Sequence, residues 1–350
     1  MVRVQVAFAC DDGYAKLAGV ALQSLISSIE ITECPLPEDL SLVVYIVDLG
    51  LHAASVEKLR QIASNSALRP VSLIFLAFDV LEAMQPVLEA QKVVYHPQCF
   101  ASLFLTELLP EECDRVIFLD CDVLVLRSIF DLWQVELGGH CLAAARDICS
   151  DATRLRGYWR RSWHPTHLAF AFASHVMALV RTNDTMRSSE PVLNSGVMLM
   201  DLARLRAMDF KNAVLDLSTR CLHLTGGSGD QDVISLFLRG RYLELPYRWN
   251  THFFLPPPFH VLLLTQEERD EVVSQGPWIV HFSGPISCPW VRSRDPEHLF
   301  HSEWFKVLDT TPWAGWRPAN AATSVLARLL SQHHLTEQLR SERPSVAEQV

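Results

Sequence analysis

The residues best suited to chemistry in this sequence are two aspartates, Asp120 and Asp122, inside the otherwise apolar stretch 116–126. On an extended backbone, residues two apart point to the same side, and ionised carboxylates cannot stay unpaired inside a buried sheet. We therefore expect the strand to end at Leu119, so that both aspartates lie at its carboxyl edge, where α/β sheets bind ligands. There they could hold a divalent cation that carries a phosphate. An ordinary pair of aspartates in a turn is the alternative.

Four further polar clusters stand where predicted strands or helices begin or end. They are 10–14 (Cys-Asp-Asp-Gly-Tyr), 194–196 (Asn-Ser-Gly), 230–232 (Asp-Gln-Asp) and 281–290 (His-Phe-Ser-Gly-Pro-Ile-Ser-Cys-Pro-Trp). Each alone has a structural explanation, because aspartates cap helices, Asn-Ser-Gly is a common turn, and a histidine at a strand end is often a core residue. The glycines before the third cluster, Gly226, Gly227 and Gly229, would let backbone approach a ligand.

The elements that must position these clusters alternate between strand and helix in the first part of the chain. Strands are predicted at 2–9, 42–47, 71–78 and 115–119, and helices at 14–29, 53–64, 82–90 and 100–109. Such alternation predicts βαβ units and a mostly parallel sheet. Later strands are predicted at 140–145, 191–200 and 278–282, with helices near 128–133, 202–217 and 231–238.

Composition narrows the class of protein. The 350 residues are 49% hydrophobic, which suits a sheet that is buried on both faces, and the net charge of −10 argues against a nucleic-acid binder. The 9 cysteines include no CxxC pair, so neither a zinc site nor a disulfide framework is indicated, and we expect a reducing, cytoplasmic location. No apolar run reaches the ~18 residues that a membrane span needs, and the first residues resemble a strand rather than a signal peptide.

Taken together and in this order, the five clusters resemble glycosyltransferase family 8, a family of retaining enzymes that includes bacterial lipopolysaccharide galactosyl- and glucosyltransferases and glycogenin. The resemblance covers about residues 2–315. It implies a single α/β domain of the Rossmann-like GT-A type, with a central, mostly parallel sheet flanked by helices, followed by a helical tail at 316–350. It also implies transfer of a hexose, galactose or glucose, from a UDP-sugar to a glycan or glycolipid acceptor such as lipopolysaccharide.

The resemblance further implies roles for individual residues. Asp120, Asp122 and His281 would ligate Mn²⁺ or Mg²⁺, whose remaining positions go to two phosphate oxygens. The other positions carried over are Asp11 and Tyr14 at the uracil, Asp147, Asn194 and Asp230 at sugar hydroxyls, Gln231 facing the anomeric carbon, and Gly284 at the diphosphate. A fixed cation and aimed backbone amides would stabilise the charge that grows on the leaving diphosphate. Asp230 and Gln231 are the expected catalytic residues, and no nucleophile is evident, which favours same-face attack.

Three departures from the family pattern keep a second class of function open. The departing positions are Gly13 in place of an asparagine, Ser102 in place of an arginine, and Ser287 with Cys288 in place of a lysine. Two cations are therefore missing beside the diphosphate unless Arg292 or Arg294 replaces one. The alternative is a catalytically weakened UDP-sugar-binding pseudoenzyme or scaffold. A hydrolase or nucleotidyltransferase is disfavoured, because residues 10–14 are not a glycine-rich phosphate loop.

Residues 151–181 form a segment longer than the family core needs. Four arginines there interleave with Tyr158, Trp159 and Trp163, and an apolar stretch follows. Aromatic faces stack on sugar rings and arginines pair with phosphates or carboxylates, so we expect a lid that covers the acceptor. An interfacial helix that touches anionic lipid at the inner membrane and an ordinary insertion packed on the core are the alternatives.

Overall fold

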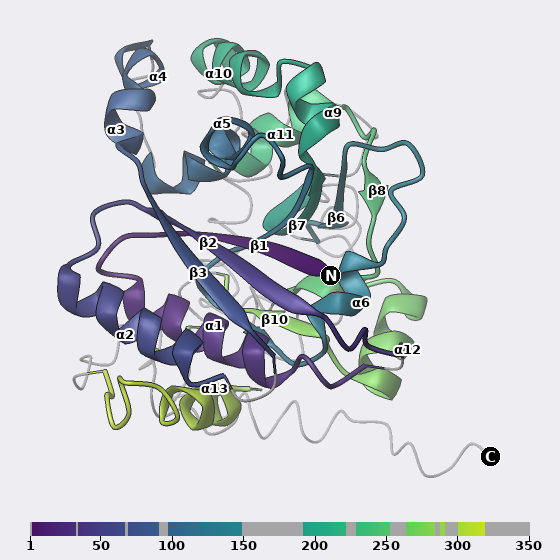
Figure 1. Cartoon of the computed structure of the whole chain (residues 1–350). Coiled ribbons are helices and arrows are strands. Elements are labelled where there is room, and N and C mark those ends of the chain that lie inside the picture. Colours follow the sequence, from purple (N-terminus) through teal and green to yellow (C-terminus); the bar gives the residue numbers. More distant parts are fainter. Residues whose placement is uncertain are drawn as a thin grey trace, which may run out of the picture.

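A central β-sheet organises the part of the chain that the computed structural model describes, which is 2–32, 34–66, 69–90, 97–148, 192–221, 229–252, 264–283, 288–290 and 300–318. Within these residues, seven strands pair in the order β3-β2-β1-β4-β7-β6-β8, and a second sheet has the order β5-β10-β9 (Figure 1). The strands of the large sheet are β3 (Val71–Ala77), β2 (Ser41–Asp48), β1 (Arg3–Cys10), β4 (Arg115–Leu119), β7 (Leu193–Asp201), β6 (Leu142–Arg146) and β8 (Leu243–Glu244). Those of the small sheet are β5 (Val123–Val125), β10 (Ile279–His281) and β9 (Thr251–His252).

Helices cover both faces of the large sheet. On one face lie α1 (Ala15–Ser27), α2 (Ala53–Ser64) and α13 (His301–Leu308), and toward the other lie α3 (Val80–Ala83), α4 (Gln85–Ala90), α5 (Leu105–Leu108), α9 (Leu202–Ala207), α10 (Phe210–Cys221) and α11 (Asp230–Leu238) (Figure 1). The remaining helices are η1 (Pro97–Phe104), α6 (Ile129–Trp133), η4 (Tyr247–Asn250) and α12 (Gln266–Gln275). None of the helices described is both long and apolar enough to cross a membrane.

Alternation of side chains along the central strands builds a hydrophobic core on each face. In β1, Val4, Val6 and Phe8 join the core shared with α1 and α2, whereas Ala7 joins the opposite core, which contains residues of η1 and α9 to α11. Successive residues of a strand point to opposite faces, so the near-continuous apolar run in β1 is what a strand covered on both sides requires. These two cores hold the carboxyl ends of the strands in place.

The predicted α/β fold with a mostly parallel sheet is confirmed. β1 pairs in parallel with β2 and β4, and β2 pairs in parallel with β3. β7 runs antiparallel to both of its neighbours, β4 and β6.

Some predicted boundaries are wrong. The predicted helix 202–217 is divided into α9 and α10 by Asp209, whose φ of 50° is left-handed and cannot continue a right-handed helix. The predicted helix 100–109 is the 3-10 helix η1 followed by the short α5. The predicted segment 151–181 and the tail from residue 319 onward lie outside the described residues.

Candidate functional site

Asp120 and Asp122 lie just beyond the end of β4. The strand ends at Leu119 as predicted, and the backbone N–H of Asp120 donates to the carbonyl of Gly196 on β7 at 2.9 Å. The chain then turns into β5, which begins at Val123, so Asp120 and Asp122 occupy the link between the two sheets. Two ionised carboxylates would be unfavourable inside a buried apolar strand. Both aspartates avoid this cost, because they lie after the last residue of β4 and before the first residue of β5.

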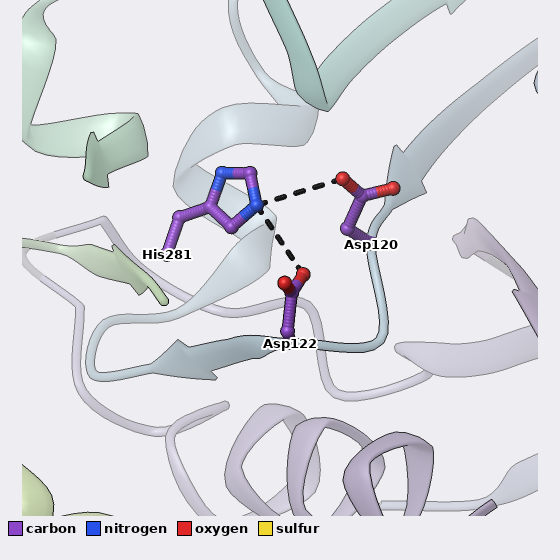
Figure 2. Close-up of side chains that lie close together, drawn as sticks. All are labelled: Asp120, Asp122 and His281. Atoms are coloured by element: carbon purple, nitrogen blue, oxygen red, sulfur yellow. Dashed lines mark ion pairs between the residues drawn. The ribbon is translucent and has the colours of Figure 1, made fainter. Parts of the chain in front are cut away.

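The small sheet brings His281 to these carboxylates. β10 pairs antiparallel with β5, which sets His281 opposite Val123, and the N–H of Phe282 donates to the carbonyl of Asp122 at 2.9 Å. Nε2 of His281 lies 3.2 Å from Oδ1 of Asp122 and 3.5 Å from Oδ2 of Asp120 (Figure 2). Each residue offers one ligand atom, and these three atoms lie within 4.8 Å of one another. Two carboxylate oxygens and one imidazole suit Mn²⁺ or Mg²⁺ better than a thiolate-preferring metal.

The electrostatics of this cluster also fit a cation. Burial and the neighbouring charge of Asp122 raise the pKa of Asp120, and His281 lowers it only in part. Burial by itself lowers the pKa of His281, but the charges of Asp122 and Asp120 and the hydrogen bond to Asp122 outweigh it and raise that pKa. Two carboxylates thus share one compensating group, and a divalent cation would satisfy both.

Asp230 and Gln231 open α11 and point into a hydrogen-bonded network. The residue directly before the helix, its N-cap Gly229, has a φ of 72°, which is in the region that favours glycine. Both carboxylate oxygens of Asp230 accept hydrogen bonds from serine hydroxyls, one from Ser102 on η1 and one from Ser195 on β7 at 3.1 Å. Burial raises the pKa of Asp230 to about 6, although the two serines lower it in part. The carboxylate is therefore oriented by neutral donors.

Gln231 connects Asp147, another predicted residue of the site, to the backbone of β7. Its Nε2 donates to Oδ2 of Asp147, and its Oε1 accepts from the backbone N–H of Ser195 at 3.4 Å. The ladder between β6 and β7 shifts register between Ala144 and Arg146, which is a bulge of the kind that redirects side chains at strand ends. Asp147 follows this bulge directly and is 9% exposed. The bulge thus places the side chain of Asp147 within hydrogen-bond distance of Gln231.

Arg146, the last residue of β6, is bound to helix α12. Its Nε and Nη2 donate to the two carboxylate oxygens of Glu268 on α12 at 2.8 and 2.6 Å. Burial raises the pKa of Glu268, but the hydrogen bonds from Arg146 and Thr265 outweigh it and hold that pKa below its usual value. The bidentate contact of this guanidinium therefore ties the end of β6 to α12.

Asp11 and Tyr14 lie on the turn between β1 and α1. Oδ1 of Asp11 accepts from the backbone N–H of Tyr14 at 3.0 Å, which shapes the turn. Tyr14 is 50% exposed, and partial burial together with the charge of Asp122 raises the pKa of its hydroxyl to about 12. Asp12 has other partners: its Oδ2 lies 2.9 Å from Nδ1 of His52, and its Oδ1 accepts from the backbone N–H of that residue at 3.0 Å. Of the two adjacent aspartates, Asp11 is therefore the one whose side chain bonds to the backbone of Tyr14.

Cys288, where a lysine was expected, is a buried thiol whose Sγ donates to the carbonyl of Phe282 at 3.3 Å. Burial and the charge of Asp122 raise the pKa of this thiol, which keeps it neutral, and a thiol in either protonation state cannot supply the positive charge of a lysine. The other predicted positions in this motif, Gly284, Ser287, Arg292 and Arg294, lie outside the described residues.

Two site residues escaped sequence reasoning. Asn250 is fully buried, with its Oδ1 3.0 Å from Nδ1 of His281 and its Nδ2 donating to Oδ1 of Asn194 at 2.7 Å. His252 pairs with His281 across the β9–β10 ladder, and its Nε2 lies 3.7 Å from Oδ1 of Asp147. The available signal in the sequence was a run of three polar residues, Asn250, Thr251 and His252, directly after Trp249.

Comparison with known proteins places the chain among glycosyltransferases. The sequence model of the family described as "Glycosyl transferase family 8" matches residues 5–293. General stress protein A of Bacillus subtilis (strain 168) is 23% identical over 313 residues, which is 87% of this chain and 92% of that protein. Lipopolysaccharide 1,2-glucosyltransferase of Escherichia coli (strain K12) is 22% identical over 349 residues, 95% of this chain and 86% of that protein. The crystal structure of the galactosyltransferase LgtC with donor and acceptor sugar analogues superposes with a TM-score of 0.64 at 20% identity, covering 88% of this chain and 96% of that one. The shared fold is GT-A.

Proposed function

Because the chain belongs to glycosyltransferase family 8, we propose that it is a metal-dependent retaining transferase that moves a hexose, glucose or galactose, from a UDP-sugar to a glycan or glycolipid. The observation that supports this most strongly is the convergence of Asp120, Asp122 and His281 at the junction of the two sheets. A divalent cation held there, Mn²⁺ or Mg²⁺, would stabilise the charge that develops on the leaving diphosphate.

The donor sugar would lie against the network behind the metal ligands. We assign Asp147, Asn194 and Asp230 to its hydroxyls, because all three are buried, polar and held by hydrogen bonds: Asp147 and Asp230 through Gln231 and Ser195, and Asn194 through Asn250. Gln231 would face the anomeric carbon with its amide held at both ends, by Asp147 and by the backbone of Ser195. Anionic and polar neighbours suit the positive charge that develops on the sugar as the glycosidic bond breaks.

The nucleotide would bind at the turn between β1 and α1. The half-exposed ring of Tyr14 can stack on uracil, and Asp11 can accept a hydrogen bond from the base edge. Retention of configuration then follows from attack on the same face of the sugar as the departing diphosphate. In that step the acceptor oxygen bonds to the anomeric carbon, the bond to the phosphate oxygen breaks, and that oxygen takes the hydroxyl proton.

For the acceptor, the match to lipopolysaccharide 1,2-glucosyltransferase supports a glycolipid of the lipopolysaccharide kind. We place the protein in the cytoplasm, peripheral to the inner membrane, where such acceptors present their sugars. The seven cysteines whose side chains are described are all free, which agrees with a reducing compartment.

A second function, binding of a UDP-sugar with little or no turnover, is favoured by one contact. Ser102, which replaces the arginine usual in the family, donates directly to Asp230. A neutral hydroxyl therefore stands where a cation would otherwise balance this carboxylate and the diphosphate. Loss of one such electrostatic donor costs about 3 kcal/mol of transition-state stabilisation.

Release of UDP separates the two functions. Purified protein is incubated with Mn²⁺ and with UDP-glucose or UDP-galactose, each with and without a truncated lipopolysaccharide acceptor, and the product is read by mass. A transferase adds one hexose to the acceptor with only one donor or with a strong preference. Donor binding in calorimetry without any UDP release supports the second function. Absence of both binding and release with either donor contradicts both.

A further inference from the structure

Asn250 connects His281, a proposed metal ligand, to Asn194, a residue proposed to bind the donor sugar. Its side chain is 0% exposed at the end of η4, directly before β9. Oδ1 faces Nδ1 of His281 at 3.0 Å, and Nδ2 donates to Oδ1 of Asn194 at 2.7 Å. One amide therefore joins a metal ligand on β10 to a sugar-side residue on β7.

The orientation of this amide follows from a backbone group. Oδ1 of Asn194 accepts from the N–H of Gly196 at 3.0 Å, and a backbone N–H can only donate. The same oxygen must then face the NH₂ group of Asn250, which turns the carbonyl oxygen of Asn250 toward His281. A carbonyl oxygen can only accept, so Nδ1 of His281 carries a hydrogen. The lone pair of the neutral ring is thereby assigned to Nε2.

We infer that Asn250 is the positioning residue of the metal site: it fixes the ring and tautomer of His281 so that Nε2 is the ligand atom, and it couples this ligand to Asn194. The inference rests on the metal dependence proposed above. Nε2 is the atom that faces Asp122 and Asp120, at 3.2 and 3.5 Å. Metal-binding histidines depend on such a partner at their second nitrogen, and its removal weakens metal affinity about 10- to 100-fold.

Metal affinity without turnover is the first test. Binding of Mn²⁺ is measured by calorimetry, with no donor present, for wild type, Asn250→Ala, Asn250→Asp and the control Asn212→Ala. Asn212 likewise donates a hydrogen bond through its side-chain amide, here to Oδ1 of Asp209 at 2.7 Å, but on the exposed surface of α10. We expect Asn250→Ala to bind Mn²⁺ about 10- to 100-fold more weakly, and Asn212→Ala to bind it like wild type.

Asn250→Asp separates the two contacts of the amide. An aspartate still accepts from Nδ1–H of His281 but cannot donate to Asn194. We therefore expect its Mn²⁺ affinity to stay close to that of wild type while its affinity for UDP-hexose falls. Equal Mn²⁺ affinity in wild type and a folded Asn250→Ala overturns the inference. A wild type that binds no Mn²⁺ contradicts the proposed metal dependence instead.

The tautomer itself gives a readout that does not depend on any variant being stable. Nitrogen-15 NMR of histidine-labelled wild type saturated with diamagnetic Mg²⁺, which replaces any hydrogen between Nε2 and the two carboxylates, is assigned by comparison with His281→Gln. We expect His281 to carry its hydrogen on Nδ1 and the metal on Nε2. In the Mg²⁺-bound wild type, a hydrogen on Nε2 with Nδ1 unprotonated overturns the inference even if Asn250→Ala does not fold.

Discussion

The ring of His281 occupies the space where residue 196 would carry a side chain. A Cβ built on Gly196 would lie 2.2 Å from Cε1 and 2.6 Å from Nδ1 of His281, and 3.0 Å from Oδ2 of Asp120. Gly196 belongs to the extended strand β7, so close packing rather than backbone conformation requires a glycine here. The backbone of β7 is thus one wall of the candidate metal site.

Gly196→Ala should displace the ring of His281 from this wall. We expect a loss of stability of about 1–3 kcal/mol from overpacking and a Mn²⁺ affinity that falls about tenfold or more as the ligand moves. Thermal unfolding and calorimetry measure the two effects. Gly138→Ala is the control for Mn²⁺ affinity alone: its added Cβ meets nothing within 4 Å in an exposed loop, but its φ of 54° makes an alanine strained there, so it too should lose stability while binding Mn²⁺ like wild type. Unchanged Mn²⁺ binding in Gly196→Ala would show that His281 is not a ligand.

Metal removal should abolish turnover, and Mn²⁺ should restore it, because Asp120, Asp122 and His281 define a site for a hard cation. Asp122→Asn should remain folded and bind Mn²⁺ weakly. In thermal unfolding, Mn²⁺ at 100 times its dissociation constant should stabilise wild type by about 2.7 kcal/mol, and Asp122→Asn by far less. Asp270→Asn, a surface change on α12, should respond like wild type. Full activity in excess EDTA would refute the assignment.

The sequence predicted the parts of the site that local patterns determine. A strand that must end before two carboxylates put Asp120 and Asp122 at the sheet edge, and the structure places both there. Likewise, apolar runs of strand length predicted β1 to β4, because burial on both faces leaves a continuous signal. The roles assigned to Asp11, Tyr14 and Gln231 remain predictions.

Pairing between distant segments was not predictable in the same way. Asn250 contacts residues 31 and 56 positions away, His281 and Asn194, so no local pattern marks it. The bulge that delivers Asp147 exists only in the pairing of β6 with β7. The replacement of a cation by Ser102 was visible in the sequence, but its direct bond to Asp230 was not.

The buried pair between Arg146 and Glu268 should contribute to stability. Glu268→Gln leaves a guanidinium that is 8% exposed without its bidentate carboxylate, so we expect a loss of about 3 kcal/mol. Asp216→Asn breaks the exposed pair with Arg220, whose side chains are 60% and 61% exposed, and should cost less than about 1 kcal/mol. Urea unfolding at pH 7 compares the two. Equal, small losses would mean that the buried pair is not stabilising.

The same pair predicts a dependence on pH. The folded-state pKa of Glu268 lies below its ordinary value of 4.5, so its stabilising effect is present above that value and is lost as pH falls through the folded pKa. The difference in stability between wild type and Glu268→Gln should therefore shrink on the acid side of pH 4.5. A difference that stays constant down to acid unfolding would contradict the assigned cause.

The stability of the protein should depend on the ionisation of Asp230 with the opposite sign, because Asp230 is a buried carboxylate oriented by neutral hydroxyls and its pKa is raised rather than lowered. Its pKa rises from 3.8 to about 6 on folding, so the folded protein binds a proton more tightly and loses stability as pH rises from 4 to 6, with no further loss above 6. Asp230→Asn removes this loss. In metal-free protein at pH 8 we expect the variant to be more stable by about 1–3 kcal/mol, with the two proteins converging below pH 4.

Turnover decides whether that gain in stability reflects a functional cost. If Asp230 serves the donor sugar, Asp230→Asn should release UDP at least tenfold more slowly with Mn²⁺ and the preferred UDP-hexose, since a charge-assisted hydrogen bond of ~1.5–3 kcal/mol is lost. A variant that is both more stable and less active is the signature of a residue kept for chemistry rather than for folding. A variant that is less stable at pH 8 would show instead that the charge of Asp230 has a structural partner, and unimpaired UDP release would remove Asp230 from the donor site.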